Sequence, residues 1–246
     1  MFDGVFHFDG EFAFAQVVAG VLAGVRADGR REVLGLGVGD SEDEVFWRGF
    51  LRALKARGLT GVCLVISDQH GGLVAAIRRC FQGAAHQRCR VHFARNLLAR
   101  VPKGHQEMVA AAFRTVFAQV SAEEIARQFD HVRDMLAERF DKAARLMDSA
   151  KEELLAFSTF PRPHWRQIWS TNPLERLNKE LKRRCRVVGI FPNEDAVVRL
   201  AGAVLADIHD EWVATERRYF SEGSMALLTA ERDDDAATGG ELDAVR

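Results

Sequence analysis

The distribution of glycine and proline constrains the fold of this chain more than any other sequence feature. Of the 20 glycines in the 246 residues, 15 lie in residues 1–104, whereas residues 105–160 contain neither Gly nor Pro. These two residue types are the strongest breakers of regular structure, so a long stretch without them favours helices. Apolar residues in the stretch recur at helical spacing; one such set is Ile125, Phe129, Val132 and Leu136. The sequence therefore predicts an all-helical insertion over 105–165.

Residues 1–104 alternate short apolar runs with turn signals and helical patterns. The run 62–66 is continuously apolar, as expected for a strand buried on both faces. Residues 12–25 and 32–38 flank the turn signal Asp28-Gly29 and are predicted to pair as strands. Three more segments complete the pattern, namely helices over 42–57 and 73–81 and a short strand over 89–92. This order predicts an α/β sheet with at least one parallel pair of strands.

Residues 166–225 are expected to complete the α/β core, with a helix over 195–213, and residues 226–246 to form a disordered tail. The net charge of −1 means that any nucleic-acid binding must come from local patches. The four cysteines contain no Cys-x-x-Cys pair, which argues against a zinc ribbon and fits a reducing cytoplasm. The longest uncharged apolar run, 12–25, is shorter than the ~20 residues that span a bilayer, so no membrane association is expected.

Residues 170–184 are predicted to form a helix that begins with an acid and continues as a basic rod. Asn172 suits the N-cap and Pro173 the first helical position. Leu174, Leu177 and Leu181 form one apolar stripe, and Glu175 heads a neighbouring row of cations that comprises Lys179, Lys182 and Arg186. Glu175 has two interpretations: a capping-box residue on a solvated basic helix, or a functional carboxylate held among cations.

Three other acids are candidates for function. Asp68 follows the buried strand and precedes Gly71-Gly72 and a helix. Ligands of open α/β sheets bind at the carboxyl ends of strands, but an Asp at this position can equally cap a helix or form a turn. Asp3 lies close to the chain terminus, where an exposed, mobile residue is the simpler interpretation. Asp9, in a predicted Asp9-Gly10 turn, is equally ambiguous.

Five segments resemble one known protein family. They are Phe2-Asp3-Gly4-Val5-Phe6, residues 24–35, Val65-Ile66-Ser67-Asp68, residues 88–96 with their Cys-x-x-His pattern, and residues 170–178. Together with the helical stretch that precedes Glu175, they resemble the DDE transposases with a ribonuclease H-like fold. The match is closest to the Mutator-type family of bacterial insertion-sequence transposases, and it extends over nearly all of residues 1–225.

The resemblance implies a ribonuclease H-like mixed sheet with flanking helices, interrupted by the helical insertion before the third acid. It implies that Asp3, Asp68 and Glu175 are the three catalytic acids and the metal ligands. Cys89 and His92 match a family signature near the active site, as does Asn172 beside the third acid. If the family resemblance is set aside, the simpler interpretation of Cys89 is a buried thiol, and that of His92 is a core or helix-cap histidine with its hydrogen bonds satisfied. One Cys and one His supply only half of a tetrahedral zinc site.

The implied chemistry explains these residue types. Phosphodiester hydrolysis and attack by the freed 3′-hydroxyl are both in-line displacements, which two Mg²⁺ (or Mn²⁺) ions can stabilise on attacking and leaving oxygens. Mg²⁺ prefers oxygen ligands, so converging carboxylates suit it. The implied partner is DNA, whose backbone would lie along Lys179, Lys182, Arg183 and Arg186, and a homo-oligomer would hold two element ends. Trp169 would stack on an unpaired base or, more simply, belong to the core.

The chain departs from the family pattern at its start. These transposases carry an N-terminal helical region that recognises the terminal repeats of the element, and nothing in this sequence corresponds to it. The expectation is therefore a catalytic part without that DNA-binding region. Two alternatives stay open: an inactive transposase remnant that still binds DNA or subunits, and a ribonuclease H-like nuclease without strand transfer.

Overall fold

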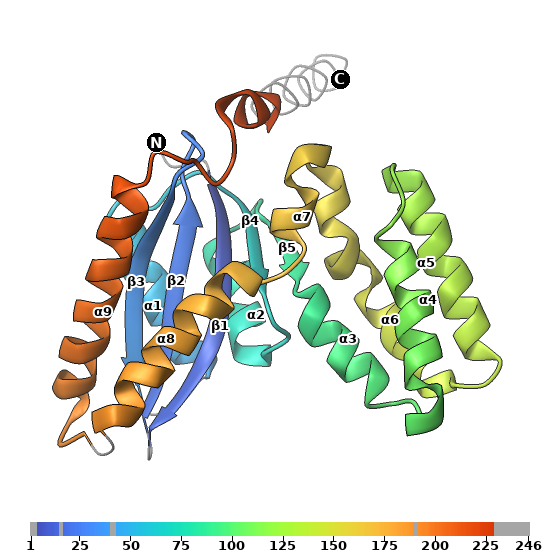
Figure 1. Ribbon diagram of the computed structural model, residues 1–246, viewed down its shortest axis with the longest axis horizontal. Helices are drawn as coiled ribbons and strands as arrows, with labels where there is room; N and C mark the ends of the chain where they lie inside the picture. The colour runs from blue at the N-terminus through green and yellow to red at the C-terminus, as the bar shows by residue number, and fades with distance from the viewer. Residues whose placement is uncertain (1–3, 15–16, 40–42, 189–190, 229–246) are drawn as a thin grey trace, which may run out of the picture.

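The computed structural model describes residues 4–14, 17–39, 43–188 and 191–228 of the chain, and it describes side chains from residue 20 onward, Pro173 excepted (Figure 1). Within these residues a sheet carries helices on both faces, and a block of helices lies beyond one edge of the sheet (Figure 1). The predicted mixed α/β class is confirmed.

The described strands form one five-stranded sheet in the order β3-β2-β1-β4-β5. The strands are β1 (Gly4–Phe14), β2 (Val17–Val25), β3 (Arg31–Gly39), β4 (Val62–Ser67) and β5 (Ala85–Arg88). The pairs β1–β2 and β2–β3 are antiparallel, whereas β1–β4 and β4–β5 are parallel. The parallel strands therefore end at a common edge, and this edge carries the residues of interest.

The Asp28-Gly29 turn joins β2 to β3, as predicted. Gly29 has a φ of 79°, which favours glycine, and its N–H donates to the carbonyl of Arg26 at 2.8 Å. The predicted extent of the preceding strand, 12–25, was wrong because it combines the end of β1 with all of β2. The connection contains no charged residue, Gly or Pro, so the pattern gave no clear sign of the break.

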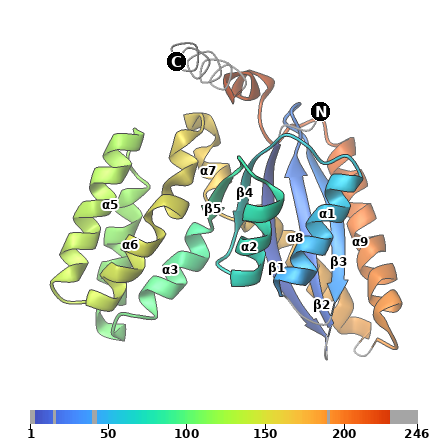
Figure 2. The ribbon, with the colours of Figure 1, turned by 180° about the vertical axis from the view of Figure 1, so that it is seen from behind.

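Two pairs of helices cover the two faces of the sheet (Figures 1 and 2). α1 (Glu44–Ala56) and α2 (Gly71–Cys80) lie on one face, and α8 (Asn172–Val188) and α9 (Glu194–Ala214) on the other. Alternate residues of a strand point to opposite faces. Accordingly Leu22 packs with the α1–α2 side, while Val21 and Ala23 pack with α8 and α9. These layers agree with the predicted helices over 42–57, 73–81 and 195–213.

Residues 105–165 contain a group of three main helices, α4 (Gln106–Val116), α5 (Ala122–Ala137) and α6 (Asp141–Leu155). The helix α3 (Arg90–Leu98) leads into the group, and α7 (Trp165–Ile168) leads out of it. The buried Gln87 of β5 links this block to the sheet, because its side-chain amide donates to the carbonyl of Leu154 at 2.9 Å and its oxygen accepts from the amide of Phe157 at 2.7 Å.

Two predicted boundaries were wrong. The strand over 89–92 lies instead at Ala85–Arg88, and residue 89 precedes a helix, because the amide of Phe93 bonds to the carbonyl of Cys89 at 3.0 Å. The disordered tail was predicted from residue 226, but residues 222–228 are helical and Leu228 is buried against the core. The rest of the predicted tail, 229–246, lies outside the described residues. In the described part of the chain no helix has the length and apolarity needed to cross a bilayer.

Candidate active site

Asp68 lies directly after β4, at the carboxyl end of the parallel strands, and is half-buried. The fully buried Ser67 fixes the backbone at this point. Its hydroxyl donates to the carbonyl of Asp68 at 2.8 Å and shares a second hydrogen bond with Nε2 of His86, also at 2.8 Å. The predicted position of Asp68 at a strand end is confirmed, and the local backbone is held by a side chain that the sequence pattern did not single out.

Cys89 connects the end of β4 to the start of α8. Its amide donates to the carbonyl of Ser67 at 2.7 Å. Its fully buried sulfur accepts hydrogen bonds from Thr171, from the amide at 3.4 Å and from the hydroxyl at 3.3 Å. Burial alone would raise the pKa of the Cys89 thiol, but hydrogen bonds from the side chains and backbones of His92 and Thr171 outweigh burial and lower this pKa. The thiol is therefore a structural acceptor in a polar contact.

Glu175 lies in the first turn of α8. The helix begins at Asn172, one residue earlier than the sequence pattern predicted, because the carbonyl of Thr171 accepts from the amides of Leu174 at 2.8 Å and of Glu175 at 3.1 Å. The cap position thus falls on Thr171, the same residue that bonds to Cys89. The predicted apolar stripe is confirmed, since Leu174, Leu177 and Leu181 are each at most 3% exposed.

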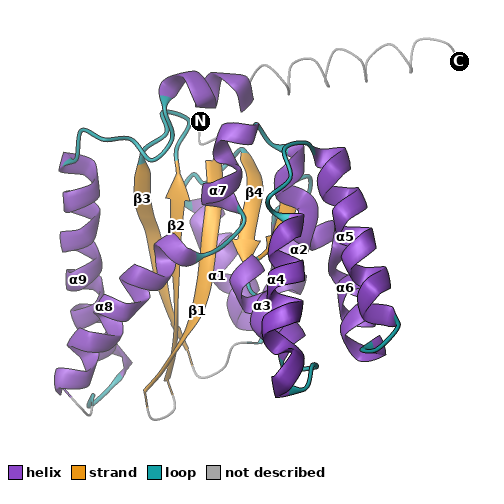
Figure 3. Cartoon of the chain, turned by 45° about the vertical axis from the view of Figure 1, so that its right-hand side comes forward, coloured by secondary structure: helices purple, strands orange, loops and turns teal. Residues whose placement is uncertain are grey.

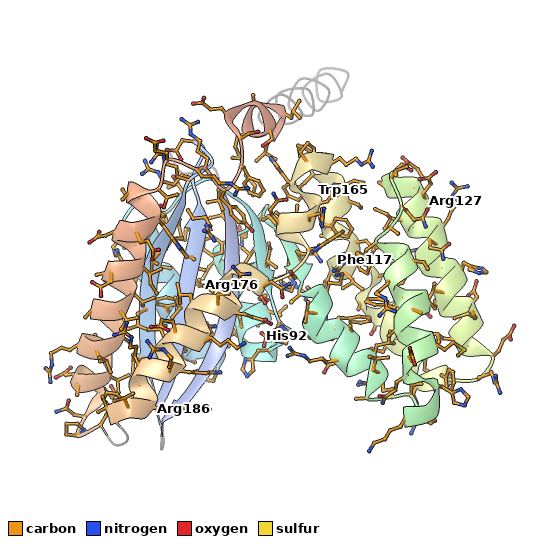
Figure 4. All side chains as sticks on the ribbon, viewed as in Figure 1. His92, Phe117, Arg127, Trp165, Arg176 and Arg186 are labelled. Atoms are coloured by element: carbon orange, nitrogen blue, oxygen red, sulfur yellow. The ribbon has the colours of Figure 1, made fainter. Side chains whose placement is uncertain are left out.

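His92 approaches Glu175 from α3. The imidazole Nε2 lies 3.9 Å from a carboxylate oxygen of Glu175, and both side chains are partly exposed. A second link fixes the same junction, because the amide of Arg90 donates to the carbonyl of Trp169 at 3.0 Å. Strand β4, the start of α3 and the start of α8 therefore meet, which places the backbone segments of Asp68 and Glu175 around Cys89 and His92 (Figure 4).

The first predicted acid, Asp3, lies outside the described residues. Strand β1 begins at Gly4, which pairs with Val62 at the start of β4 and thus at the end of β4 opposite to Asp68. The predicted Asp9-Gly10 turn was wrong, because both residues lie within β1 and Asp9 pairs with Val21.

The aligned residues of the parallel pair β1–β4 end two residues before Asp9 and Asp68. His7 pairs with Ile66, and two residues further along both chains lead to Asp9 and Asp68. Adjacent strands lie ~4.8 Å apart, so the same register continued by two residues would bring the two backbone positions side by side. Strand register depends on pairing between distant segments, which explains why the sequence pattern alone did not favour Asp9.

The exposed face of α8 is strongly basic, as predicted. Lys179, Lys182, Arg183 and Arg186 are all exposed. The sequence pattern missed two further residues on this helix. Arg176 is also exposed, near the start of the helix (Figure 4). Glu180 bonds to Arg183 at 2.6 Å and to Arg184 at 2.8 Å, and these two guanidinium groups lower its pKa to about 2.

Trp169 is partly buried against the core rather than presented for stacking. Its ring packs edge-on to Phe117 and Phe157, with centroids 5.7 and 5.8 Å away. The guanidinium carbon of Arg90 lies 4.0 Å from the ring centroid. Three neighbours thus surround the indole, which favours the core alternative over base stacking.

The side chains that the structure describes include no group of three or more His, Cys, Asp or Glu residues arranged to hold a metal ion. The description does not extend to the side chains of Asp3 and Asp9. Asp68 and Glu175 offer hard oxygen ligands, and Mg²⁺ in proteins is usually held by one or two carboxylates plus waters and substrate phosphates. The donor set at this edge therefore fits Mg²⁺ or Mn²⁺. Cys89 and His92 supply only two of the four ligands of a tetrahedral zinc site.

The family model described as "Transposase, Mutator family" matches residues 12–215. The transposase for insertion sequence element IS1081 from Mycobacterium tuberculosis is 49% identical over 212 residues, which cover 86% of this chain and 50% of that protein. The transposase for IS256 in transposon Tn4001 from Staphylococcus aureus is 38% identical over 204 residues, 82% of this chain and 52% of that protein. For the transposase for IS406 from Burkholderia multivorans the identity is 40% over 194 residues, 78% and 50% respectively. The chain spans about half the length of the curated relatives it matches.

Proposed function

The chain belongs to the Mutator family of transposases, and on this premise we propose that it carries the catalytic core of a DDE transposase, which cuts DNA at insertion-sequence ends and joins the freed strand to target DNA. The observation that carries the proposal is the junction at Cys89, whose hydrogen bonds to Ser67 and Thr171 join the segment of Asp68 to that of Glu175. Two acids far apart in sequence thus share one edge of the sheet.

The strand arrangement supports the ribonuclease H-like part of the proposal. The order β3-β2-β1-β4-β5, with an antiparallel β1–β2–β3 meander and parallel β4 and β5, is the arrangement expected for that fold. The helical insertion enters between β5 and α8, before the third acid, as the resemblance implies.

For the first acid we propose Asp9 in place of Asp3. The argument is the backbone register, whose last pair, His7 and Ile66, comes two residues before Asp9 and Asp68, whereas Asp3 precedes the residue paired with the far end of β4. The family match begins at residue 12, so neither acid is covered by it. A third carboxylate beside Asp68 would complete the oxygen donors at this edge.

Asp9, Asp68 and Glu175 would hold two Mg²⁺ or Mn²⁺ ions. Two such ions supply charge stabilisation to the attacking and leaving oxygens of an in-line displacement. In the first displacement water attacks phosphorus, and the 3′ oxygen leaves with a proton as a hydroxyl. In the second that hydroxyl attacks a target phosphodiester, loses its proton, and displaces the target's own 3′ oxygen.

The residues around the acids have separate tasks in this proposal. Cys89 and Thr171 hold the first turn of α8, and with it Glu175, against the end of β4. His92, 3.9 Å from Glu175, adds positive charge beside the carboxylate when it is protonated. The cations of α8 would bind the DNA backbone, which adds affinity without sequence specificity. A homo-oligomer would bring two element ends together.

Substitution of Glu175 tests the proposal. We expect Glu175→Gln to abolish Mg²⁺-dependent cleavage and joining of DNA that carries the element ends. Glu123→Gln, which removes an exposed acid from the first turn of α5, serves as the matched control and should act like wild type. Undiminished activity in Glu175→Gln would contradict the assignment. Nicks without joined products would favour a nuclease, and DNA binding without any product would favour the inactive remnant.

A comparison of two Asp→Asn variants tests the first acid. Asp9→Asn should abolish metal-dependent cleavage and weaken Mn²⁺ binding measured by calorimetry, whereas Asp3→Asn should leave both unchanged. The opposite result would restore Asp3 as the first acid.

A further inference from the structure

A pocket of about 310 Å³ lies between α3 and α4, the two neighbouring helices that face the reader in Figure 3. Its walls are largely apolar, and they include Ala94 and Leu98 from α3, Phe113 from α4 and Phe117 directly after α4. The volume is at the lower end of the ~300–1,000 Å³ range of ligand pockets. A helix with its side chains is ~10 Å or more across, so the pocket suits one planar ring rather than a helix of a partner protein.

Arginines surround this apolar space. Arg90, Arg95 and Arg114 all line the pocket, and the latter two are exposed, so their guanidinium groups lie at its mouth. Among the described residues no ion pair occupies Arg95 or Arg114. An apolar interior with a cationic mouth is complementary to a ligand that combines an aromatic ring with an anionic group.

The pocket adjoins the candidate active site. Arg90 follows Cys89 directly, and its guanidinium carbon lies 4.0 Å from the ring centroid of Trp169 and 4.8 Å from that of Phe117. Two residues further along α3, His92 approaches Glu175. A DNA strand that passes the acids therefore needs to extend only a short distance to reach the pocket.

We propose that this pocket binds one unpaired nucleotide of the DNA substrate, with the base against Phe113 and Phe117 and the adjoining phosphate at Arg95 and Arg114. This inference rests on the function proposed above. Aromatic side chains bind any unpaired base through its π-face, whatever the sequence.

A cavity-filling variant tests the proposal on the purified 246-residue chain. Ala110→Leu adds bulk to the pocket wall on α4, and Ala111→Leu places the same side chain on the exposed neighbouring position. The probes are a 20-base-pair duplex with a three-nucleotide 3′ overhang carrying 2-aminopurine and the matched blunt duplex. We expect Ala110→Leu to weaken overhang binding about tenfold, within the range of one lost base stack, and to abolish the fluorescence change. Blunt-duplex binding should be unchanged, and Ala111→Leu should match wild type.

A second variant protects the test against misfolding. Arg114→Gln alters only an exposed side chain, and it should weaken overhang binding more than blunt-duplex binding. Equal affinity of wild type and Ala110→Leu for the overhang probe would overturn the proposal. A protein segment would then be the better candidate for the occupant of the pocket. If wild type binds both duplexes equally, the inference about the pocket is wrong but the proposed function is not affected. If wild type binds neither duplex and Glu175→Gln does not change DNA cleavage or joining, the proposed function is wrong.

Discussion

At the scale of single residues, Thr171 performs two tasks that meet at the candidate active site. Its hydroxyl and amide bond to the sulfur of Cys89, while its carbonyl accepts the amide of Glu175. The side chain of Thr171 is fully buried, so water does not substitute for a lost partner. A small displacement of Thr171 would therefore also displace Glu175.

We expect Thr171→Val to lower metal-dependent DNA cleavage by about 10–100-fold, the usual effect of losing a residue that orients a metal ligand. Valine keeps the shape of threonine but lacks the hydroxyl that donates to Cys89. The metal concentration for half-maximal rate should rise as well, which a general loss of stability would not cause. Titrations of rate against Mg²⁺ measure both effects.

Thr171→Ser is the conservative control, because it keeps the hydroxyl and removes a methyl group. It should retain a nearly normal metal dependence. If the serine and valine variants are impaired to the same degree, packing of the methyl group matters rather than the hydrogen bond, and the positioning role of Thr171 is wrong.

At the scale of elements, an acidic residue of helix α8 offsets part of the positive charge of the same helix. Glu180 is bonded to Arg183 and Arg184, which reduces the cationic character of its central turn. DNA binding in this region would have to compete with that pairing. The helix is thus less basic toward DNA than its sequence suggests.

Glu180→Gln should strengthen binding to duplex DNA and make the affinity fall more steeply with salt. The substitution frees two arginines, and each additional phosphate contact changes the logarithmic salt slope by about 0.9 for B-DNA. Fluorescence anisotropy at several salt concentrations measures this slope. Glu194→Gln, at the exposed start of α9, is a control for the change of net charge; equal slopes in both variants would mean that α8 does not contact the DNA.

Three elements meet at Glu153 of α6, whose carboxylate contacts Arg78 of α2 at 2.6 Å and His86 of β5 at 3.6 Å. The imidazole of His86, 3.6 Å away, is the main cause that lowers the pKa of Glu153 below its ordinary value of 4.5, and Arg78 adds to it. A carboxylate with a lowered folded-state pKa stabilises the fold above its unfolded pKa, and this contribution is lost as the pH falls through the folded pKa. The cluster should therefore stabilise the protein at neutral pH and fail in acid.

We expect the stability difference between wild type and Glu153→Gln to be fully present above the ordinary carboxyl pKa of 4.5 and to be lost as the pH falls through the lowered folded-state pKa. Urea unfolding at a series of pH values gives this difference directly. Glu152→Gln, the exposed neighbour, should show no such dependence. A difference that persists in acid would mean that packing, not charge, accounts for the effect.

Local patterns predicted the elements well where a single helix or strand determines them. The stripe Leu174, Leu177 and Leu181 is buried as its spacing indicates, and Asp68 follows the buried strand as expected. The short apolar pattern at 89–92 misled because its backbone is fixed by contacts with Ser67, remote in sequence. Asp9 escaped notice for the same reason, since only the register with β4 gives it a neighbour.

At the scale of the whole molecule, the helical block is not a separate domain in its packing. One hydrophobic cluster contains Leu64 and Ile66 of the sheet together with Phe129 and Leu136 of α5. Phe157 lies at its centre, fully buried, with its ring centroid 5.7 Å from that of Phe117 and 5.5 Å from that of Trp165. A shared core of this kind makes sheet and block depend on each other for stability.

We therefore expect one cooperative unfolding transition for the sheet layers and the helical block. Replacing Trp165 and Trp169 by Phe leaves Trp47 and Trp212, which pack with the sheet, as fluorescence reporters. Far-UV circular dichroism follows the helices, many of which belong to the block. In this background the two signals should change at the same temperature.

Phe157→Ala should then lower both midpoints together by roughly 6–20 °C, because loss of a buried Phe costs about 3–5 kcal/mol in a protein of this size. The aromatic ring leaves a cavity where β5, α4 and α7 approach one another, so the damage reaches the sheet although Phe157 follows α6 in the chain. Val120→Ala, at an exposed position of the block, should leave both midpoints in place. A fall of the dichroism midpoint alone, with Trp47 and Trp212 still reporting a folded sheet, would mean that the block unfolds independently and that the junction at Cys89 survives without it.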